Sequence, residues 1–506
     1  MLQLQLLAFL LVFPLYFLFR LLKHGRFHVI PRNGILPPGP PKLPFIGNLH
    51  QLSGSSPHRV LRQLSMRYGA LMSLQLGFVP TLVVSSATMA REFLKTHDLN
   101  FATRPSLLCQ QKLSYNGSDL AFAPYGDHWR EVKKICTLEL FSAKRVQSFR
   151  FIREEEISLL VKSISQLASS SSSANLTQMV FDLTNNIICR IAFGKSFKHE
   201  GCQKSSFHEL LFEAQALMGR FAFTDYFPVV GWLFDALTGL HARLKRNCRG
   251  LDLFYQHVID DHLDPRRPNP EKEDITDILL RMQKDGLSSI DLNMNDIKAM
   301  IMNIFFAGTD TSSAVVIWAM TELSKNPKVM QKAQDEIRGL IGNKGYVDED
   351  DLHQFHYLKC VIKETLRLHP PGPLLVQREA RNHCTIDGFD IYPKTRVIIN
   401  AWAIGMDPET WENPEEFLPE RFSDGSVDFK GQHYEYIPFG SGRRMCPGMN
   451  LGMVTVEHTL SNLLYSFDWD LPVGIKMEDI DMDELPGVAV HKKNDLRLLP
   501  INFNGH

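Results

Sequence analysis

The sequence predicts a mainly helical protein with a small amount of β-sheet, preceded by one membrane-spanning helix. Three observations lead to this prediction. Residues 2–19 are apolar apart from two glutamines. Residues 72–76 and 81–85 are apolar or alternating runs that flank a glycine and a proline, as expected for two paired strands. Beyond residue 87, apolar side chains recur mostly with the period of an α-helix.

The N-terminal apolar run has the length and the flanking charges of a membrane anchor. Its 18 residues would span about 27 Å as a helix, close to the roughly 30 Å hydrocarbon core. Arg20, Lys23 and Arg26 follow it and no lysine or arginine precedes it, which predicts that the rest of the chain faces the cytosol. A cleaved signal peptide is the alternative, but its basic start and small-residue cleavage site are missing. We therefore interpret residues 1–22 as an uncleaved, single-pass anchor.

The rest of the chain divides into a short connection and one large domain. Residues 23–41 form a basic linker that ends in the proline-rich hinge Leu36–Pro41, which polyproline stiffness makes a rigid spacer. Serine-, proline- and glycine-rich segments interrupt the helical pattern further on. None of them is interpreted as a domain boundary, because the motifs described below lie on both sides and must meet at one ligand. Residues 42–506 are therefore predicted as one domain.

Charge and cysteine content exclude several classes of protein. The chain has 55 basic and 56 acidic residues, so its overall charge gives no indication of nucleic-acid binding. The closest two of the eight cysteines, Cys189 and Cys202, are 13 positions apart, so the chain has no C-x-x-C zinc or redox pair. Scattered cysteines at this density suit a reducing compartment and no disulfide framework.

The segment Phe439–Gly448 has the composition of a ligand-binding loop. It places Cys446 between glycines and arginines, just ahead of the apolar helical stretch Leu451–Ser466. Free backbone amides at that helix N-terminus are expected to lower the pKa of the thiol and favour the thiolate. The glycines allow sharp turns close to a flat ligand, and Arg444 offers a permanent cation. A buried, inert cysteine in a tight turn is the alternative for Cys446.

This ten-residue pattern resembles the haem-binding signature of the cytochrome P-450 family. The resemblance implies that Cys446 is the axial thiolate ligand of haem b iron, in a loop where Phe439 and Gly440 also contact the cofactor. It further implies that the haem propionates meet a set of four side chains. These are Arg444, Arg378, Trp129 and Lys133. Lys133 stands where the family usually has arginine, so that contact lacks a bidentate fork.

A second motif lies about 135 positions before Cys446, on a helix predicted from Asn295 as its N-cap to Asn326. Taken alone, its Gly-Thr pair would be a tolerated kink in a core helix. Residues 307–312, however, match the oxygen-activation motif of the same family. That match implies that Thr311 and Asp310 deliver protons into a dry pocket and that Gly308 leaves room for dioxygen.

Two more groups of residues follow from the resemblance. Glu364, Arg367 and Arg421 match the family's buried structural Glu-Arg-Arg core, although an E-x-x-R pair alone is equally an exposed ion pair. The substrate pocket is predicted along one stripe of the long helix and at two later turns. Its residues are Asn303, Phe306, Ala307, Leu374, Leu375, Val376 and Val488. Asn303 is either a polar handle for substrate or a buried amide satisfied by its protein neighbours.

The resemblance covers essentially the whole chain and is greatest to the plant A-type microsomal members. It implies a monooxygenase on the endoplasmic reticulum membrane that inserts one oxygen atom of O2 into a lipophilic small molecule. Electrons would come from NADPH through NADPH–cytochrome P-450 reductase. Two alternatives remain: a haem-thiolate isomerase or dehydratase acting without O2, and a non-catalytic haem-binding membrane protein. Terpenoid, phenylpropanoid, alkaloid and oxime substrates all stay open.

Overall fold

The computed structural model describes residues 34–52, 56–196, 201–268, 271–485 and 487–503. The predicted anchor, residues 1–22, lies outside the described residues, as do residues 23–33 of the predicted linker. The described part is mainly helical with small sheets, as the sequence predicts.

The helices and strands follow one another along the chain within these bounds. The helices are α2 (Pro57–Tyr68), α3 (Ala87–Arg91), α4 (Asp98–Phe101), α5 (Leu108–Leu113), α6 (Asp127–Ile135), α7 (Ala143–Ser148), α8 (Arg150–Ser169), α9 (Leu176–Phe193), α10 (Gly201–Met218), α11 (Gly231–Leu237), α12 (Leu240–Leu263), α13 (Ile275–Lys284), α14 (Met294–Lys325), α15 (Pro327–Ile341), α16 (His356–Leu368), α17 (Ala401–Gly405) and α18 (Met449–Ser466). The strands are β1 (Leu71–Leu76), β2 (Val79–Val84), β3 (Ala174–Asn175), β4 (Arg378–Glu379), β5 (Cys384–Ile386), β6 (Phe389–Ile391), β7 (Arg396–Ile399), β8 (Phe467–Asp470), β9 (Glu484–Leu485), β10 (His491–Lys492) and β11 (Arg497–Asn502).

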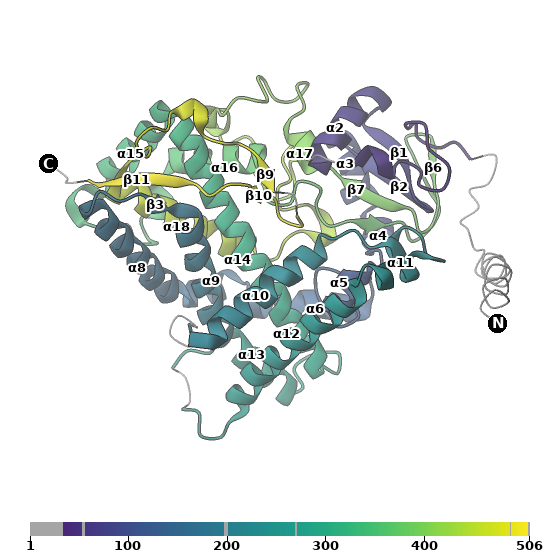
Figure 1. Ribbon diagram of the computed structural model, residues 1–506, viewed down its shortest axis with the longest axis horizontal. Helices are drawn as coiled ribbons and strands as arrows, with labels where there is room; N and C mark the ends of the chain where they lie inside the picture. Colours follow the sequence, from purple (N-terminus) through teal and green to yellow (C-terminus); the bar gives the residue numbers. More distant parts are fainter. Residues whose placement is uncertain (1–33, 53–55, 197–200, 269–270, 486, 504–506) are drawn as a thin grey trace, which may run out of the picture.

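The strands form small sheets at two ends of the molecule (Figure 1). The predicted strand pair is confirmed as β1 and β2, which are antiparallel with Leu71 opposite Val84. Strand β7 adds to β2 in parallel, and β4 completes the order β1-β2-β7-β4. At the other end β11 pairs with β3 and β8, while β9 and β10 form a separate hairpin. A sheet that collects β4 and β7 brings Arg378 close to residues far earlier in the chain.

Helix α14 runs through the centre of the molecule and packs against α9, α16 and α18 (Figure 1). Among the described residues it is the one helix apolar and long enough to cross a membrane, but 72% of its apolar window is buried, as in a core helix. Its N-cap is Asn293 rather than the predicted Asn295. The Asn293 side chain accepts hydrogen bonds from the backbone N–H groups of Asn295 and Asp296. The Asp296 carboxylate in turn accepts a hydrogen bond from the backbone N–H of Asn293. This reciprocal capping box fixes where the helix begins.

The Glu364 carboxylate forms ion pairs with two arginines. Arg367 donates to both of its oxygens at 2.8 Å, and Arg421 donates to one of them at 3.0 Å. The remaining guanidinium N–H groups reach backbone carbonyls, including Gly405 and Pro414 for Arg367. Glu364 and Arg367 are fully buried, so complete pairing is what makes their burial tolerable.

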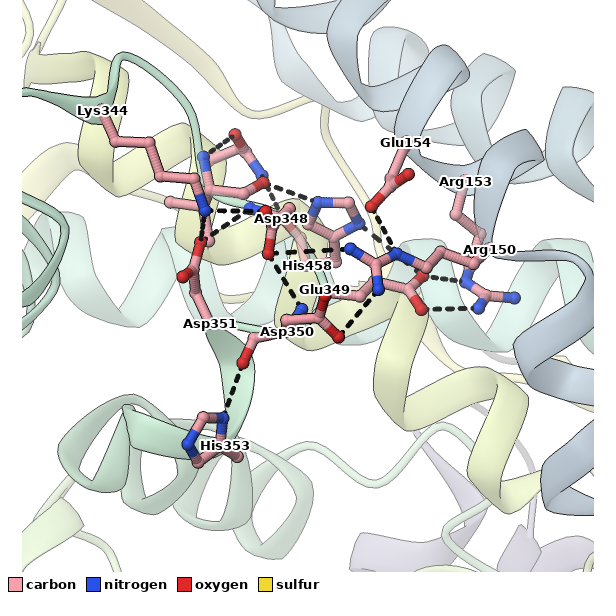
Figure 2. Close-up of polar contacts among 12 residues, drawn as sticks. Arg150, Arg153, Glu154, Lys344, Asp348, Glu349, Asp350, Asp351, His353 and His458 are labelled. Atoms are coloured by element: carbon pink, nitrogen blue, oxygen red, sulfur yellow. Dashed lines mark hydrogen bonds and ion pairs between the residues drawn. The ribbon is translucent and has the colours of Figure 1, made fainter.

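A second buried ion pair joins α8 to the loop between α15 and α16 (Figure 2). Arg153 is fully buried and donates to Glu349, with 2.8 Å between Nη2 and Oε2, and to the Val146 carbonyl at 3.0 Å. His458 of α18 reaches the same loop through the Val347 carbonyl at 2.9 Å, and burial lowers its pKa. Arg150, one turn before Arg153, pairs only with carboxylates that are themselves partly exposed.

The contrast between these two arginines is testable. Arg153→Leu should lower the free energy of unfolding by about 3–5 kcal/mol, because it leaves Glu349 buried without its cation. Arg150→Leu on the same helix should cost no more than about 1 kcal/mol, since its partners remain solvated. Urea denaturation of both variants measures the difference. Equal effects would show that burial of the Arg153–Glu349 pair contributes nothing special.

Candidate functional site

The loop before α18 turns at glycines whose backbone conformation other residues rarely adopt. Gly440 and Gly442 have φ values of 68° and 71°, in the left-handed region. A Cβ on Gly442 would lie 2.4 Å from the Leu94 carbonyl oxygen. The backbone N–H of Cys446 donates to the Phe439 carbonyl at 3.0 Å, which closes the loop. Phe439 in turn packs edge-on against Phe429, with ring centroids 5.3 Å apart.

Cys446 has accessible surface on its side chain, yet enough protein atoms surround the sulfur that burial raises the pKa of its thiol. The backbone N–H groups of Gly448 and Met449 and the ammonium of Lys133 lower that pKa, but burial is the larger effect. The helix N-terminus therefore acts in the expected direction, but it does not by itself bring the pKa of the thiol below its ordinary value. A metal ion at the sulfur would remove the proton outright.

Helix α14 is accessible at one point along its length. Ala307 is exposed in the middle of this otherwise buried helix, and Thr311 follows one turn later. The Thr311 hydroxyl donates to the Ala307 carbonyl at 2.6 Å. A Cβ on Gly452 of α18 would lie 3.7 Å from the Ser312 hydroxyl, so the two helices touch within a few residues of both motifs. The fold thus brings the segments that carry Thr311 and Cys446 close together.

Gly308 lies where α14 packs closely against another helix, and its predicted role of leaving room for dioxygen stays a prediction. A Cβ at this position would lie 2.5 Å from Cδ1 of Ile188. Ile188 belongs to α9, which packs closely along α14. The missing side chain therefore allows the two helices to approach each other, on a different face from Ala307.

Asp310 has a partner that the sequence did not indicate. Its Oδ2 lies 3.1 Å from Nε2 of His491, on β10. His491 is 28% exposed and Asp310 is 13% exposed. A titratable pair thus leads from the surface to the residue next to Thr311.

Four cationic side chains lie close to the Cys446 loop. Arg378 is buried and donates to Asp98 and to the Ser441 carbonyl, each at 3.0 Å. Arg444 lies over the Trp129 ring, with its guanidinium carbon 4.0 Å from the centroid. Lys133 donates to the carbonyls of Arg443 and Met445. Sequence reasoning missed the fourth, Arg104, because a lone arginine in a loop carries no pattern.

This cluster has more positive charge than its surroundings neutralise. Burial and the like charge of Arg378 lower the pKa of Arg444 to about 9. Burial, Arg444 and Arg378 together lower the pKa of Arg104. Of the described residues, Asp98 and Asp119 are the carboxylates that oppose these shifts. A haem fits, because its two propionates would supply the missing negative charge while Cys446 supplies a metal ligand.

The predicted pocket residues differ in what they do. Leu375 comes within 3.8 Å of the position of a Gly440 Cβ, which places it beside the Cys446 loop. Leu374, Val376 and Phe306 are half-buried, and Val488 is exposed next to Gly219. Asn303 does not offer a free polar group. Its Oδ1 accepts from the backbone N–H groups of Leu120 and Ala121, and its Nδ2 donates to Asp119, so the protein-satisfied alternative describes it.

Comparisons with known proteins agree with this geometry. The family model described as "Cytochrome P450" matches residues 37–498. Cytochrome P450 71A1 of Persea americana is 53% identical over 457 residues, covering 90% of this chain and 91% of the relative. Strychnine-11-hydroxylase of Strychnos nux-vomica is 50% identical over 499 residues, covering 97% of each chain. A zebra fish cytochrome P450 solved with progesterone has a TM-score of 0.76 at 25% identity, covering 88% of this chain and all of that one. The chain therefore belongs to the cytochrome P450 family.

Proposed function

We propose that the protein is a membrane-bound haem-thiolate monooxygenase of plant specialised metabolism. It would insert one oxygen atom from O2 into a lipophilic small molecule, by hydroxylation or a related oxidation. The observations that carry the proposal are the exposed Cys446 thiol, the accessible Ala307–Thr311 stripe of α14 and the cluster of cations, which we infer to border one internal space. The name of the strychnine-11-hydroxylase relative supports hydroxylation as the reaction type.

Each group around the space has a distinct task. Cys446 would hold the haem iron, and Arg104, Arg378, Arg444 and Lys133 would hold the propionates. Haem bound in this way supplies the activation of O2 and the transfer of one oxygen atom. The protein excludes water from the space and delivers protons to it.

Proton delivery would run along the Asp310 side of α14. The more exposed His491 takes up a proton from solvent, and Asp310 lies within 3.1 Å of it. The Thr311 hydroxyl donates its hydrogen bond to the Ala307 carbonyl at 2.6 Å. The lone pairs of its oxygen therefore stay available to accept a hydrogen bond from a water molecule. A water fixed there would carry protons onward from Asp310.

Electrons would come from NADPH through NADPH–cytochrome P-450 reductase. Arg130, Lys134 and Arg443 are exposed around the Cys446 loop and α6, on the side from which the thiolate would be reached. Lys133 is less available, because its ammonium donates to backbone carbonyls of the loop. A negatively charged partner surface fits this cluster.

Exposed apolar side chains support a location on the endoplasmic reticulum membrane with the catalytic domain facing the cytosol. Ile35 and Phe45 near the start of the described chain are 63% and 78% exposed. Trp232 and Leu237 of α11 are 49% and 75% exposed, at the same end of the molecule as β1 and β2 (Figure 1). Apolar groups of this kind fit a lipid surface beside the predicted anchor.

The substrate class is open among lipophilic small molecules. An apolar wall is formed by Phe306 of α14 and by the half-buried Leu374, Leu375 and Val376 that follow α16. Asn303 adds no free polar group to it, because its amide is hydrogen-bonded to the protein. A screen of reductase-supplemented microsomes against terpenoids, phenylpropanoids, alkaloids and oximes, reading NADPH use and product together, identifies the substrate. Turnover without O2 or NADPH would favour the isomerase or dehydratase alternative.

The first prediction concerns the metal ligand. Cys446→Ser should abolish the thiolate-type carbon monoxide difference spectrum and all oxidation of substrate, because the hydroxyl is not a thiolate ligand. Cys384→Ser, which changes a half-buried cysteine on β5, is the matched control and should keep both. A Cys446→Ser protein with an unchanged spectrum would overturn the haem assignment.

The second prediction concerns proton delivery. Thr311→Ala should keep the carbon monoxide spectrum but lower the product formed per NADPH consumed by on the order of 10- to 100-fold, with peroxide released instead. Thr321→Ala is the matched control, because Thr321 makes the same hydrogen bond to the carbonyl four residues earlier, at 2.7 Å, far from the site. Unchanged coupling in Thr311→Ala would refute the role of its hydroxyl.

The third prediction concerns the membrane. Deletion of residues 1–23 should release much of the protein from membranes while the haem spectrum stays intact. The exposed apolar residues of α11 should leave some residual binding to lipid vesicles, measured by co-sedimentation. Loss of the haem spectrum on truncation would show that the N-terminal segment belongs to the folded core.

A further inference from the structure

Asn303 and Asp119 form a closed hydrogen-bonded unit between α14 and the segment that precedes α6. Nδ2 of Asn303 donates to Oδ2 of Asp119 at 2.8 Å. Oδ1 of Asn303 accepts from Leu120 N–H at 2.9 Å and from Ala121 N–H at 3.1 Å. Oδ1 of Asp119 accepts from Phe122 N–H at 3.0 Å. Four consecutive residues are thus tied, directly or through Asp119, to one amide on α14.

The same segment turns its carbonyls toward the cation cluster. Arg444 donates to the carbonyls of Leu120 and Ala123 at 3.2 and 2.6 Å. Arg104 donates to the Ala121 carbonyl at 3.0 Å. The Trp129 ring, which lies under Arg444, donates to the Leu120 carbonyl at 2.9 Å. Its N–H groups therefore face Asn303 and Asp119, and its carbonyls face the cations and Trp129.

We propose that Asn303 and Asp119 are positioning residues for the propionate-binding arginines: they fix segment 119–123, and its carbonyls fix Arg444, Arg104 and Trp129. The proposal rests on the haem binding proposed above. It assigns Asn303 to cofactor retention instead of substrate orientation. Both residues would act on the cofactor through the backbone of residues 120–123, which their hydrogen bonds hold in place.

Burial and charge support this arrangement. Asp119 is fully buried, and burial raises the pKa of its carboxyl to about 6, against the opposing effect of the Asn303 hydrogen bond and the backbone N–H groups. Ionised Asp119 also raises the pKa of Arg104 and of Arg444, which burial and Arg378 lower. The carboxylate therefore compensates part of the positive charge that would otherwise repel within the cluster.

An exchange of the two side chains tests the proposal. In Asn303→Asp alone, two carboxylates face each other across the 2.8 Å contact. In Asp119→Asn alone, the new amide oxygen can still accept from Phe122 N–H. Its NH2 group then faces the NH2 group of Asn303, so two donors oppose each other. In the double variant N303D/D119N, the new carboxylate accepts from Leu120, Ala121 and the new amide, whose oxygen accepts from Phe122. These four hydrogen bonds therefore return and the net charge is unchanged.

The readout is the rate at which the purified holoprotein loses haem to excess apomyoglobin. Each single variant should lose haem about 10- to 100-fold faster than the wild type, the range expected when a residue supporting the ligands is lost. N303D/D119N should return close to the wild-type rate. Asn295→Asp makes the same chemical change on an exposed residue of α14 and should leave the rate unaltered.

The outcomes separate the inference from the proposed function. Wild-type rates in both single variants, or a double variant as fast as the singles, would overturn the positioning role. If the single variants are purified without haem, recovery of haem content in N303D/D119N is the deciding measurement. A wild-type protein without a thiolate-type carbon monoxide spectrum would overturn the proposed function, and the inference with it.

Discussion

The site depends on holding several guanidinium groups close together away from bulk water. Burial lowers the pKa of Arg104, Arg378 and Arg444; like-charge repulsion from Arg378 lowers the pKa of the other two further, and Arg444 also lowers that of Arg104. Such a cluster is stable only if its N–H groups are paired and its charge is partly balanced. Asp98 and Asp119 give part of the balance, and a dianionic cofactor edge would give the rest.

The need to pair these N–H groups explains why the backbone around the site is irregular. A carbonyl inside a helix or sheet already accepts one hydrogen bond from its own ladder, so loop carbonyls are the more available acceptors for these N–H groups. The carbonyls that accept from the three arginines all lie in loop segments. They belong to Ala102, Leu120, Ala121, Ala123, Val376, Gln377 and Ser441. Gly442 contributes to this irregular backbone, because its left-handed φ brings the Cys446 loop against Leu94 and Asp98.

Sequence reasoning succeeded where the signal is local and failed where it depends on a distant partner. Helical period and the Cys446 loop are local, so the fold class, α14 and α18 were predictable to within a few residues. Asn303 was ambiguous because its partner Asp119 lies 184 positions earlier. His491 and Arg104 carry no motif at all, and only the fold places them beside Asp310 and Arg444. The stripe through Ala307 and Thr311 shows which residues share a face, but not what lies opposite that face.

Helix α14 shows why the surroundings of Gly308 and Asn303 could not be predicted from the sequence. Successive residues of a helix point about 100° apart, so one turn can meet three different surroundings. The Gly308 side meets Ile188 of α9, the Asp310 side meets His491 of β10, and the Ala307–Thr311 side stays open. One turn before Ala307, Asn303 meets the segment that carries Asp119. A single helix therefore aligns the Asp310–His491 pair, the accessible Ala307–Thr311 face and the contact with the segment that carries Asp119, so a shift of α14 would disturb all three together.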